Sequence, residues 1–141
     1  MDPYTFQIVL LIILIILSGF FSASETALMA LSRIRVRHVV DEEIKGAKLL
    51  EKLLEDPNKL LGGILIGNNI VNIGASSLAS TLAFRIFGDG GVALATGVMT
   101  ILVLIFGEIT PKSLAKQNAE KVSLAVAPII NIVVTVFKPL V

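Results

Sequence analysis

Oxygen-bearing side chains interrupt three otherwise apolar stretches of this chain, and their types and spacing could bind a metal ion. "LSGFFSASET" carries hydroxyls and a carboxylate, "IGNNIVN" carries amides, and "IFGEITPK" carries a carboxylate between a glycine and a proline. Hydroxyl, amide, carbonyl and carboxylate oxygens are the ligands of hard cations such as Mg²⁺, Ca²⁺ and Mn²⁺. Na⁺ takes similar ligands. The pattern therefore favours an oxygen-lined cation site.

The stretch "IFGEITPK" (105–112) has a specific backbone consequence. In an α-helix the N–H of residue i donates to the carbonyl of residue i−4, and proline has no N–H. We therefore expect Pro111 to leave the Gly107 carbonyl without its partner, directly beside Glu108. A charged side chain in mid-membrane costs roughly 2.5–3.5 kcal/mol on insertion scales. Such a cost indicates a functional role for Glu108.

Simpler explanations exist for each of these residues taken singly. Serines in membrane helices often donate to their own backbone four residues earlier, and asparagines often hold helices together. Glu108 could pair with Lys112, and Glu25 could extend toward Arg33 or headgroup water. The concentration of oxygens in three separate stretches nevertheless favours an ion site for the set.

The composition indicates that the segments carrying these groups lie in a lipid bilayer. Of the 141 residues, 55% are hydrophobic, and the mean hydropathy is +0.88, more apolar surface than a soluble domain of this size can bury. There is no cysteine and one histidine, His38, which excludes thiolate catalysis and Cys-type metal sites. We expect no enzymatic activity and no nucleic-acid partner.

Three segments are long enough to cross about 30 Å of hydrocarbon, namely residues 4–31, 60–87 and 92–115. A fourth apolar stretch, 122–137, is marginal in length and carries Pro128 and Asn131, which favours an interfacial or re-entrant helix. The sequence therefore predicts an all-α membrane protein with three transmembrane helices per subunit. Residues 1–141 are expected to form a single transmembrane domain.

The segment 33–59 is expected to be a cytoplasmic amphipathic helix or helical hairpin. Its apolar positions recur at helical spacing, and Pro57 should end the pattern. An ordinary solvated hairpin is the alternative. Basic residues fill this loop and follow the third span, so the positive-inside rule places both in the cytoplasm, with the N-terminus outside. The predicted location is the plasma membrane.

Glycines predict close helix packing. Gly63, Gly67 and Gly74 continue a small-xxx-small pattern, which lets helix backbones approach, and Gly19 allows a bend in the first span. Three spans are few to enclose a hydrated path. We therefore expect a homodimer that packs through these three glycines.

The stretches "FFSASETALMALSRIRV", "LLGGILIGNNIVNI" and "IFGEITPKSLAKQNAEKV" resemble the transmembrane domain of the CorC/CNNM family of magnesium transporters. The resemblance implies a dimer with three spans per subunit, a cytoplasmic hairpin and a C-terminal amphipathic juxtamembrane helix at about 119–138. It also implies Mg²⁺ transport, generally efflux, with Na⁺ as the coupling ion. Family members continue into cytoplasmic CBS domains, so we expect this chain to be a truncated part of a longer protein.

The resemblance and the oxygen inventory together give a predicted site. The ion is expected to be bound by Ser22, Ser24, Asn68, Asn69, Asn72, Gly107 and Glu108. Five further positions are expected to support these ligands or act as hinges: Ser18, Gly19, Glu25, Pro111 and Lys112. Two rival functions remain open, a non-transporting membrane anchor or Mg²⁺ sensor and a Na⁺ or proton carrier.

Overall fold

Apolar helical segments dominate the computed structural model, which describes residues 3–140 and contains no strand in that range. The elements are α1 (Pro3–Ala30), α2 (Arg33–Asp41), α3 (Ala47–Leu54), α4 (Pro57–Phe87), α5 (Asp89–Leu102), the π-helix η1 (Val103–Ile109), α6 (Thr110–Gln117), α7 (Ala119–Phe137) and the 3₁₀ turn η2 (Lys138–Leu140). The all-helical fold expected from the sequence is confirmed for these residues.

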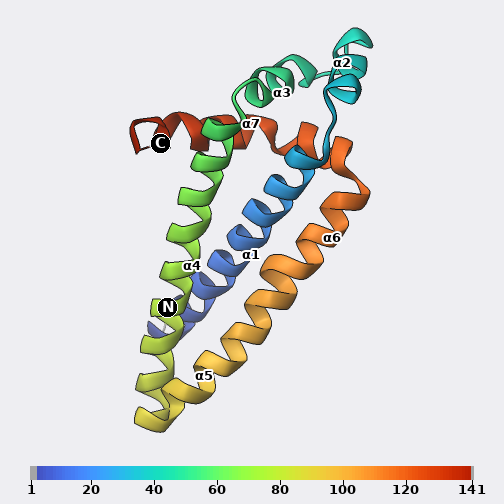
Figure 1. Cartoon of the computed structure of the whole chain (residues 1–141). Helices are drawn as coiled ribbons and strands as arrows, with labels where there is room; N and C mark the ends of the chain where they lie inside the picture. Colours follow the sequence, from blue (N-terminus) through green and yellow to red (C-terminus); the bar gives the residue numbers. More distant parts are fainter. Residues whose placement is uncertain (1–2, 141) are drawn as a thin grey trace.

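Three long rods form the body of the fold (Figure 1). The first is α1 and the second is α4. The third is the continuous run of α5, η1 and α6. A tight turn at Gly88, whose φ of 78° is accessible to glycine without strain, joins α4 to α5 at one end. At the other end, α7 lies across the rods instead of alongside them (Figure 1).

The loop between the first two rods is a pair of short helices, and local signals set their limits. The Arg35 backbone N–H donates to the Ser32 hydroxyl at 3.1 Å, which caps α2. The Lys59 N–H donates likewise to an Asp56 carboxylate oxygen at 3.2 Å, at the start of α4. Such caps satisfy helix N–H groups that have no partner within the helix. Pro57 follows the end of α3, as predicted, and occupies the first turn of α4, which therefore begins three residues before the predicted span.

Four helical runs are long and apolar enough to cross a membrane by length and composition: Tyr4–Ala30, Pro57–Phe87, Gly90–Gln117 and Ala119–Leu140. The last is longer than the sequence suggested. Its exposed side carries Ile129, Ile132 and Val136, together with the polar residues Lys121 and Thr135.

The main core lies where α7 crosses the rods. Leu28, Leu60 and Ile130 come from α1, α4 and α7, and all are at most 1% exposed. Leu50 of α3 is fully buried in the same cluster, a burial worth about 1.5–3 kcal/mol for such a side chain. The hairpin and α7 are also joined by Arg35, whose Nε donates to a Glu120 carboxylate oxygen at 2.8 Å.

Two of the three glycines expected to pack a dimer lie inside the protomer instead. A Cβ on Gly63 would lie 3.1 Å from the Val134 Cα of α7, and one on Gly67 would lie 2.8 Å from the Phe21 ring of α1. Gly74 faces Leu14 at ordinary contact distance. A small-xxx-small pattern shows that a helix can be approached closely but not which helix approaches it. Here α1 and α7 fill that role.

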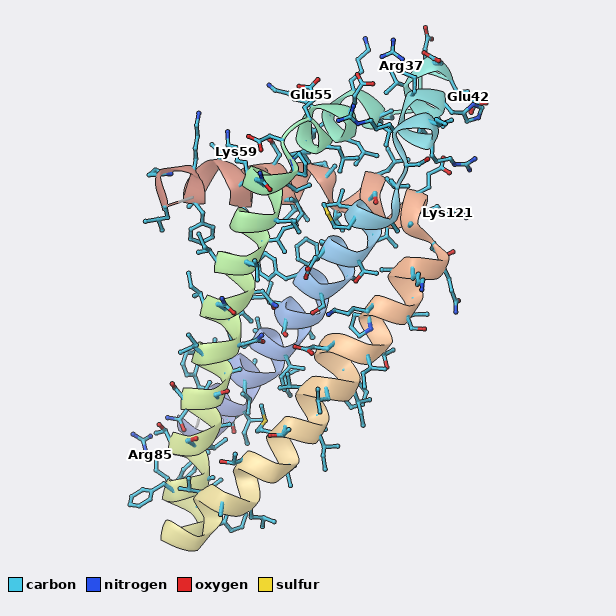
Figure 2. The ribbon with its side chains drawn as sticks, viewed as in Figure 1. Arg37, Glu42, Glu55, Lys59, Arg85 and Lys121 are labelled. Atoms are coloured by element: carbon cyan, nitrogen blue, oxygen red, sulfur yellow. The ribbon has the colours of Figure 1, made fainter. Side chains whose placement is uncertain are left out.

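Charged side chains mark the two ends of the body. Figure 2 shows the labelled side chains Arg37, Glu42, Glu55, Lys59 and Lys121 at the α7 end and Arg85 near the opposite end. The sequence between Lys59 and Arg85 contains no charged residue. This distribution leaves an apolar band whose polar exceptions form the candidate site.

Candidate ion site

Residues from all three rods meet near the middle of the body. The Ser18 hydroxyl of α1 donates to the Asn72 side-chain oxygen of α4 at 2.7 Å. The same hydroxyl oxygen lies 3.1 Å from where a Cβ on Gly107 of η1 would stand. Any larger residue at position 107 would push Ser18 away. The predicted convergence of the three polar stretches is thus present at these three residues.

This meeting point lies at mid-depth along the rods. Asn72 is fifteen residues from either end of α4, and Ser18 is within two residues of the centre of α1. At 1.5 Å per residue, α4 is about 46 Å long against roughly 30 Å of hydrocarbon. A helix centred in the bilayer therefore holds Asn72 at its midplane, where water is scarce and an oxygen needs a partner.

The third rod is distorted where it meets α1. The Thr110 N–H donates to the Ile105 carbonyl, five residues back, so the segment is π-helical and not α-helical as assumed. The N–H groups that could reach the Phe106 carbonyl belong to Thr110 and to Pro111, which has none. The freed oxygen is therefore that of Phe106, one residue before the predicted Gly107.

Glycine at position 19 is what allows this distorted segment to approach α1. A Cβ there would stand 3.1 Å from the Phe106 oxygen and 3.2 Å from the Pro111 ring. The Gly19 Cα thus faces the freed carbonyl, a geometry in which a Cα–H can act as a weak donor. The predicted role of Gly19 and Pro111 in bringing spans together fits this contact, and their action as hinges stays a prediction.

The predicted α1 residues divide between two faces. Ser22 follows Ser18 by one turn and is 1% exposed, while Glu25, on the same face by spacing, is half-buried. Ser24 is fully buried, but its hydroxyl donates to its own helix at the Phe20 carbonyl, at 2.7 Å. Its spacing of six from Ser18 turns it away from that face. Ser24 does not join the cluster.

The three asparagines of α4 are also placed differently. Asn68 has a buried side-chain oxygen with no hydrogen-bond partner among the described residues. An unsatisfied buried acceptor costs about 1–3 kcal/mol unless water or an ion meets it. Because α1 and α4 run in opposite directions, Asn68 lies at the level of Ser22. Asn69 is exposed on the neighbouring face of α4.

The remaining predicted residues lie on the third rod. Gly107 is buried, Glu108 is half-buried and Lys112 is exposed. Within residues 3–140, no ion pair joins Glu108 to Lys112, and no group of three His, Asp or Glu side chains gathers to hold a metal. The predicted ligand set accordingly contains neutral oxygens and a single carboxylate.

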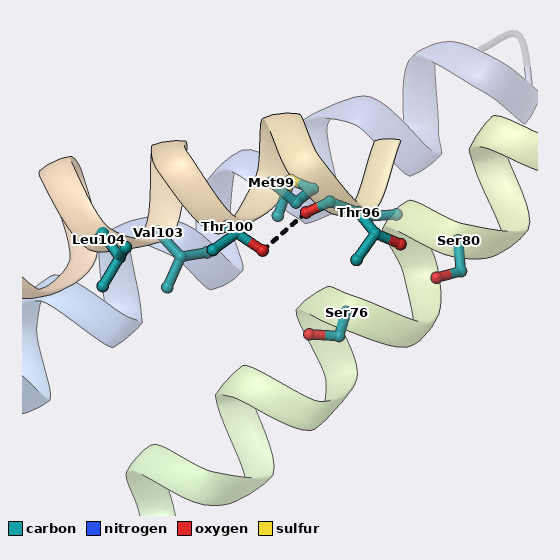
Figure 3. Close-up of a pocket in the computed structure, with 8 residues that line it drawn as sticks. Ser76, Ser80, Thr96, Met99, Thr100, Val103 and Leu104 are labelled. Atoms are coloured by element: carbon teal, nitrogen blue, oxygen red, sulfur yellow. Dashed lines mark hydrogen bonds between the residues drawn. The ribbon is translucent and has the colours of Figure 1, made fainter. Parts of the chain in front are cut away.

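A groove lined by four hydroxyl side chains and four apolar ones, which the sequence analysis did not identify, lies beyond this cluster. A cavity of about 290 Å³ separates α4 from α5, with Ser76 and Ser80 on one wall and Thr96 and Thr100 on the other (Figure 3). Both threonine hydroxyls donate to carbonyls of their own helix, at 2.8 and 2.7 Å. The signal was present in the sequence, since Asn69, Asn72, Ser76 and Ser80 follow helical spacing.

The Ser18–Asn72 bond should couple the two helices energetically. Removing it with Ser18→Ala leaves the oxygen of the half-buried Asn72 without this donor, so we expect a loss of about 1 kcal/mol of unfolding free energy. Asn72→Leu should cost less in the Ser18→Ala background than in wild type. Denaturant unfolding in detergent would measure this double-mutant cycle. Strict additivity of the two single changes would contradict the coupling.

Helices of this length with an apolar exterior and polar groups at mid-depth define a multi-pass membrane protein. Residues 9–141 match the model of the cyclin M (CNNM) transmembrane N-terminal domain, so the chain belongs to this family. The resemblance identified from the sequence motifs is confirmed.

Named relatives agree with this assignment. A UPF0053 protein of Haemophilus influenzae is 47% identical over 139 residues, covering 99% of this chain and 33% of that protein. The UPF0053 inner membrane protein YfjD of Escherichia coli is 49% identical over 107 residues, 76% of this chain and 25% of that protein. A DUF21 domain-containing chloroplast protein of Arabidopsis thaliana is 41% identical over 124 residues, covering 87% of this chain and 19% of that protein. The chain spans a third or less of the length of these relatives.

Proposed function

We propose that this chain is the membrane domain of a Mg²⁺ transporter, with efflux as its direction and Na⁺ as the coupling ion. The observation that carries the proposal is the meeting of Ser18, Asn72 and Gly107 at mid-depth, next to Glu108. The unpartnered Asn68 oxygen supports it, because that acceptor needs a partner. Membership in the CNNM family agrees with this function.

The donor set suits a divalent cation that gives up water reluctantly. Mg²⁺ requires near-octahedral oxygen geometry at about 2.0–2.1 Å. Glu108 supplies the charge, and the side-chain oxygens of Asn68, Asn72 and Ser22 supply neutral ligands. The Asn72 oxygen accepts from Ser18 with one lone pair and has a second for a cation. Ser18 then orients a ligand instead of acting as one.

We further propose three spans, formed by α1, α4 and the α5–α6 rod, with α7 in the membrane boundary across their ends. Its place in Figure 1 supports this topology, because a helix lying across the rods does not run parallel to them. Its apolar outer face would contact acyl chains. As part of the proposal, the hairpin end lies in the cytoplasm of a plasma-membrane protein and the N-terminus outside, which the basic residues of the hairpin support through the positive-inside rule.

A homodimer is part of the proposal. In the most apolar stretch of the third rod only 6% of the residues are buried in the protomer, and Leu94, Ile101 and Ile109 stand more than half exposed along the rod. Lipid or a second copy can cover such a surface. Because three spans enclose little volume, a second copy is the occupant that would shield an ion path.

A non-transporting anchor or sensor is the strongest rival. The hydrogen bond between Ser18 and Asn72 and the back-bonded Ser24 are what a purely packing role predicts. The third function, a Na⁺ or proton carrier through Glu25 and Glu108, differs in its cargo. Both rivals make predictions that transport assays can separate.

Reconstitution into liposomes tests the proposal directly. Protein-containing vesicles loaded with a Mg²⁺-sensitive dye should show Mg²⁺ flux well above protein-free vesicles, and an opposing Na⁺ gradient should accelerate it. Flux of Na⁺ or protons with Mg²⁺ omitted would instead indicate the carrier. Absence of any flux, with Mg²⁺-dependent stabilisation retained, would indicate the sensor.

A further inference from the structure

We propose that the groove between α4 and α5 is filled with water and forms the half of the ion path on the side away from the hairpin. This inference rests on the proposed function, since it extends the path from the same cluster. Ser76, Ser80, Thr96 and Thr100 line the groove among apolar neighbours. Four hydroxyls on two facing walls give passing water or a hydrated cation acceptors along its length.

The groove is continuous in sequence with the ion cluster. Ser76 follows Asn72 by one helical turn on α4, and Leu104, at the inner end of the other wall, precedes Gly107 by three residues. Residues one turn apart are neighbours on a helix surface. An ion that leaves the cluster toward the α4–α5 turn therefore next meets groove residues of both α4 and the third rod.

Its length matches the remaining depth of the membrane. Ser80 lies about 12 Å along α4 from Asn72, at 1.5 Å per residue, against roughly 15 Å from midplane to headgroups. Thr96 lies eleven residues from Gly107 along the third rod, about 16 Å at 1.5 Å per residue, near the same end. The hydroxyls thus extend from the cluster almost to the surface where α4 and α5 join.

The threonines suit a path more than a fixed binding site. Thr96 and Thr100 each donate their proton to their own helix, which directs their free lone pairs outward. Neutral acceptors without a carboxylate bind a hydrated cation weakly, and a conducting path requires weak binding. No charged residue stands between Lys59 and Arg85 or between Asp89 and Glu108 to hold the ion there.

The absence of cysteine from the sequence permits a clean accessibility test. Single variants Ser80→Cys, Thr96→Cys and Thr100→Cys are reconstituted and treated, from the α4–α5 side, with a charged, membrane-impermeant methanethiosulfonate. Only a hydrated thiol forms the reactive thiolate, so these positions should react at least roughly tenfold faster than a lipid-facing one. Val98→Cys is the matched control, because Val98 lies between the threonines in depth, points to the opposite face and is 49% exposed.

Reaction at the groove positions and not at Val98→Cys supports the proposal. Equal reactivity at all four positions, or no reaction at any of them, overturns the proposal. In that case lipid or a second copy fills the groove instead of water. A second measurement, Thr100→Val, should lower Mg²⁺ flux severalfold while Mg²⁺-dependent thermal stabilisation stays as in wild type. Unchanged flux also overturns it. If wild-type protein shows no flux, the proposed function fails, yet labelling still decides whether the groove is hydrated.

Discussion

Replacing Glu108 with glutamine should abolish Mg²⁺-dependent stabilisation and flux together. Glu108 is the only ionisable residue between Asp89 and Lys112 on the third rod and the only charge in the proposed cluster. At a concentration about a hundred times Kd, a bound ion stabilises the folded state by roughly 2.7 kcal/mol. We expect Glu108→Gln to weaken binding at least about a hundredfold, a loss of some 2.8 kcal/mol in binding free energy.

The measurement is thermal unfolding of purified protein across a Mg²⁺ titration, followed by liposome flux. Glu55→Gln provides the control, since it removes the same charge from an exposed hairpin position. Glutamine is close in size to glutamate, and Glu108 has no ion-pair partner within residues 3–140, so the variant should fold. A wild-type Mg²⁺ response in Glu108→Gln would rule out the proposed site.

Adding a single methyl group at position 19 should destabilise the protein and disrupt transport. In Gly19→Ala the new Cβ would stand 3.1 Å from the Phe106 oxygen and 3.2 Å from the Pro111 ring. One neighbour is backbone and the other a rigid ring, so α1 and η1 must separate. Overpacking of this kind costs about 1–3 kcal/mol. Thermal and denaturant unfolding in detergent would measure the loss.

Gly97→Ala is the matched control, because no atom lies within 4 Å of a Cβ there. Alanine favours a helix by up to about 1 kcal/mol over glycine, so this variant should be unchanged or slightly more stable. The changes in unfolding free energy caused by the two substitutions should thus have opposite signs. Equal stability for Gly19→Ala and Gly97→Ala would show that the close contact between α1 and η1 is absent.

The sequence predicted the all-helical class and singled out the polar residues within each span, because both depend on local patterns. Apolar runs set the rods, and caps at Ser32 and Asp56 set the hairpin limits. The face shared by Ser18 and Ser22 also follows from spacing alone. That spacing already separated Ser24 from them, so its assignment as an ion ligand relied on the family resemblance.

Features that depend on a partner helix could not be predicted. Gly67 was assigned to a dimer, but whether a glycine meets Phe21 of its own chain or a second copy depends on tertiary packing. The missing proline N–H was evident at Pro111, yet which carbonyl it frees depends on α or π spacing. That choice is made where η1 meets α1. Ligation by the asparagines and Glu108 remains a prediction.

The π-helix η1 also changes the direction in which the side chains of α6 point relative to those of α5. A π turn amounts to one extra residue in an α-helix and rotates everything after it by about 100°. In the structure this rotation directs Ala115 toward the interior, where it is 1% exposed, while Leu114 is 57% exposed. If the same sequence ran as an unbroken α-helix, Leu114 would take the place of Ala115 against α1. Deleting one residue between Val103 and Ile109 would therefore convert the π turn to α-helix and leave α6 in its present orientation against α1.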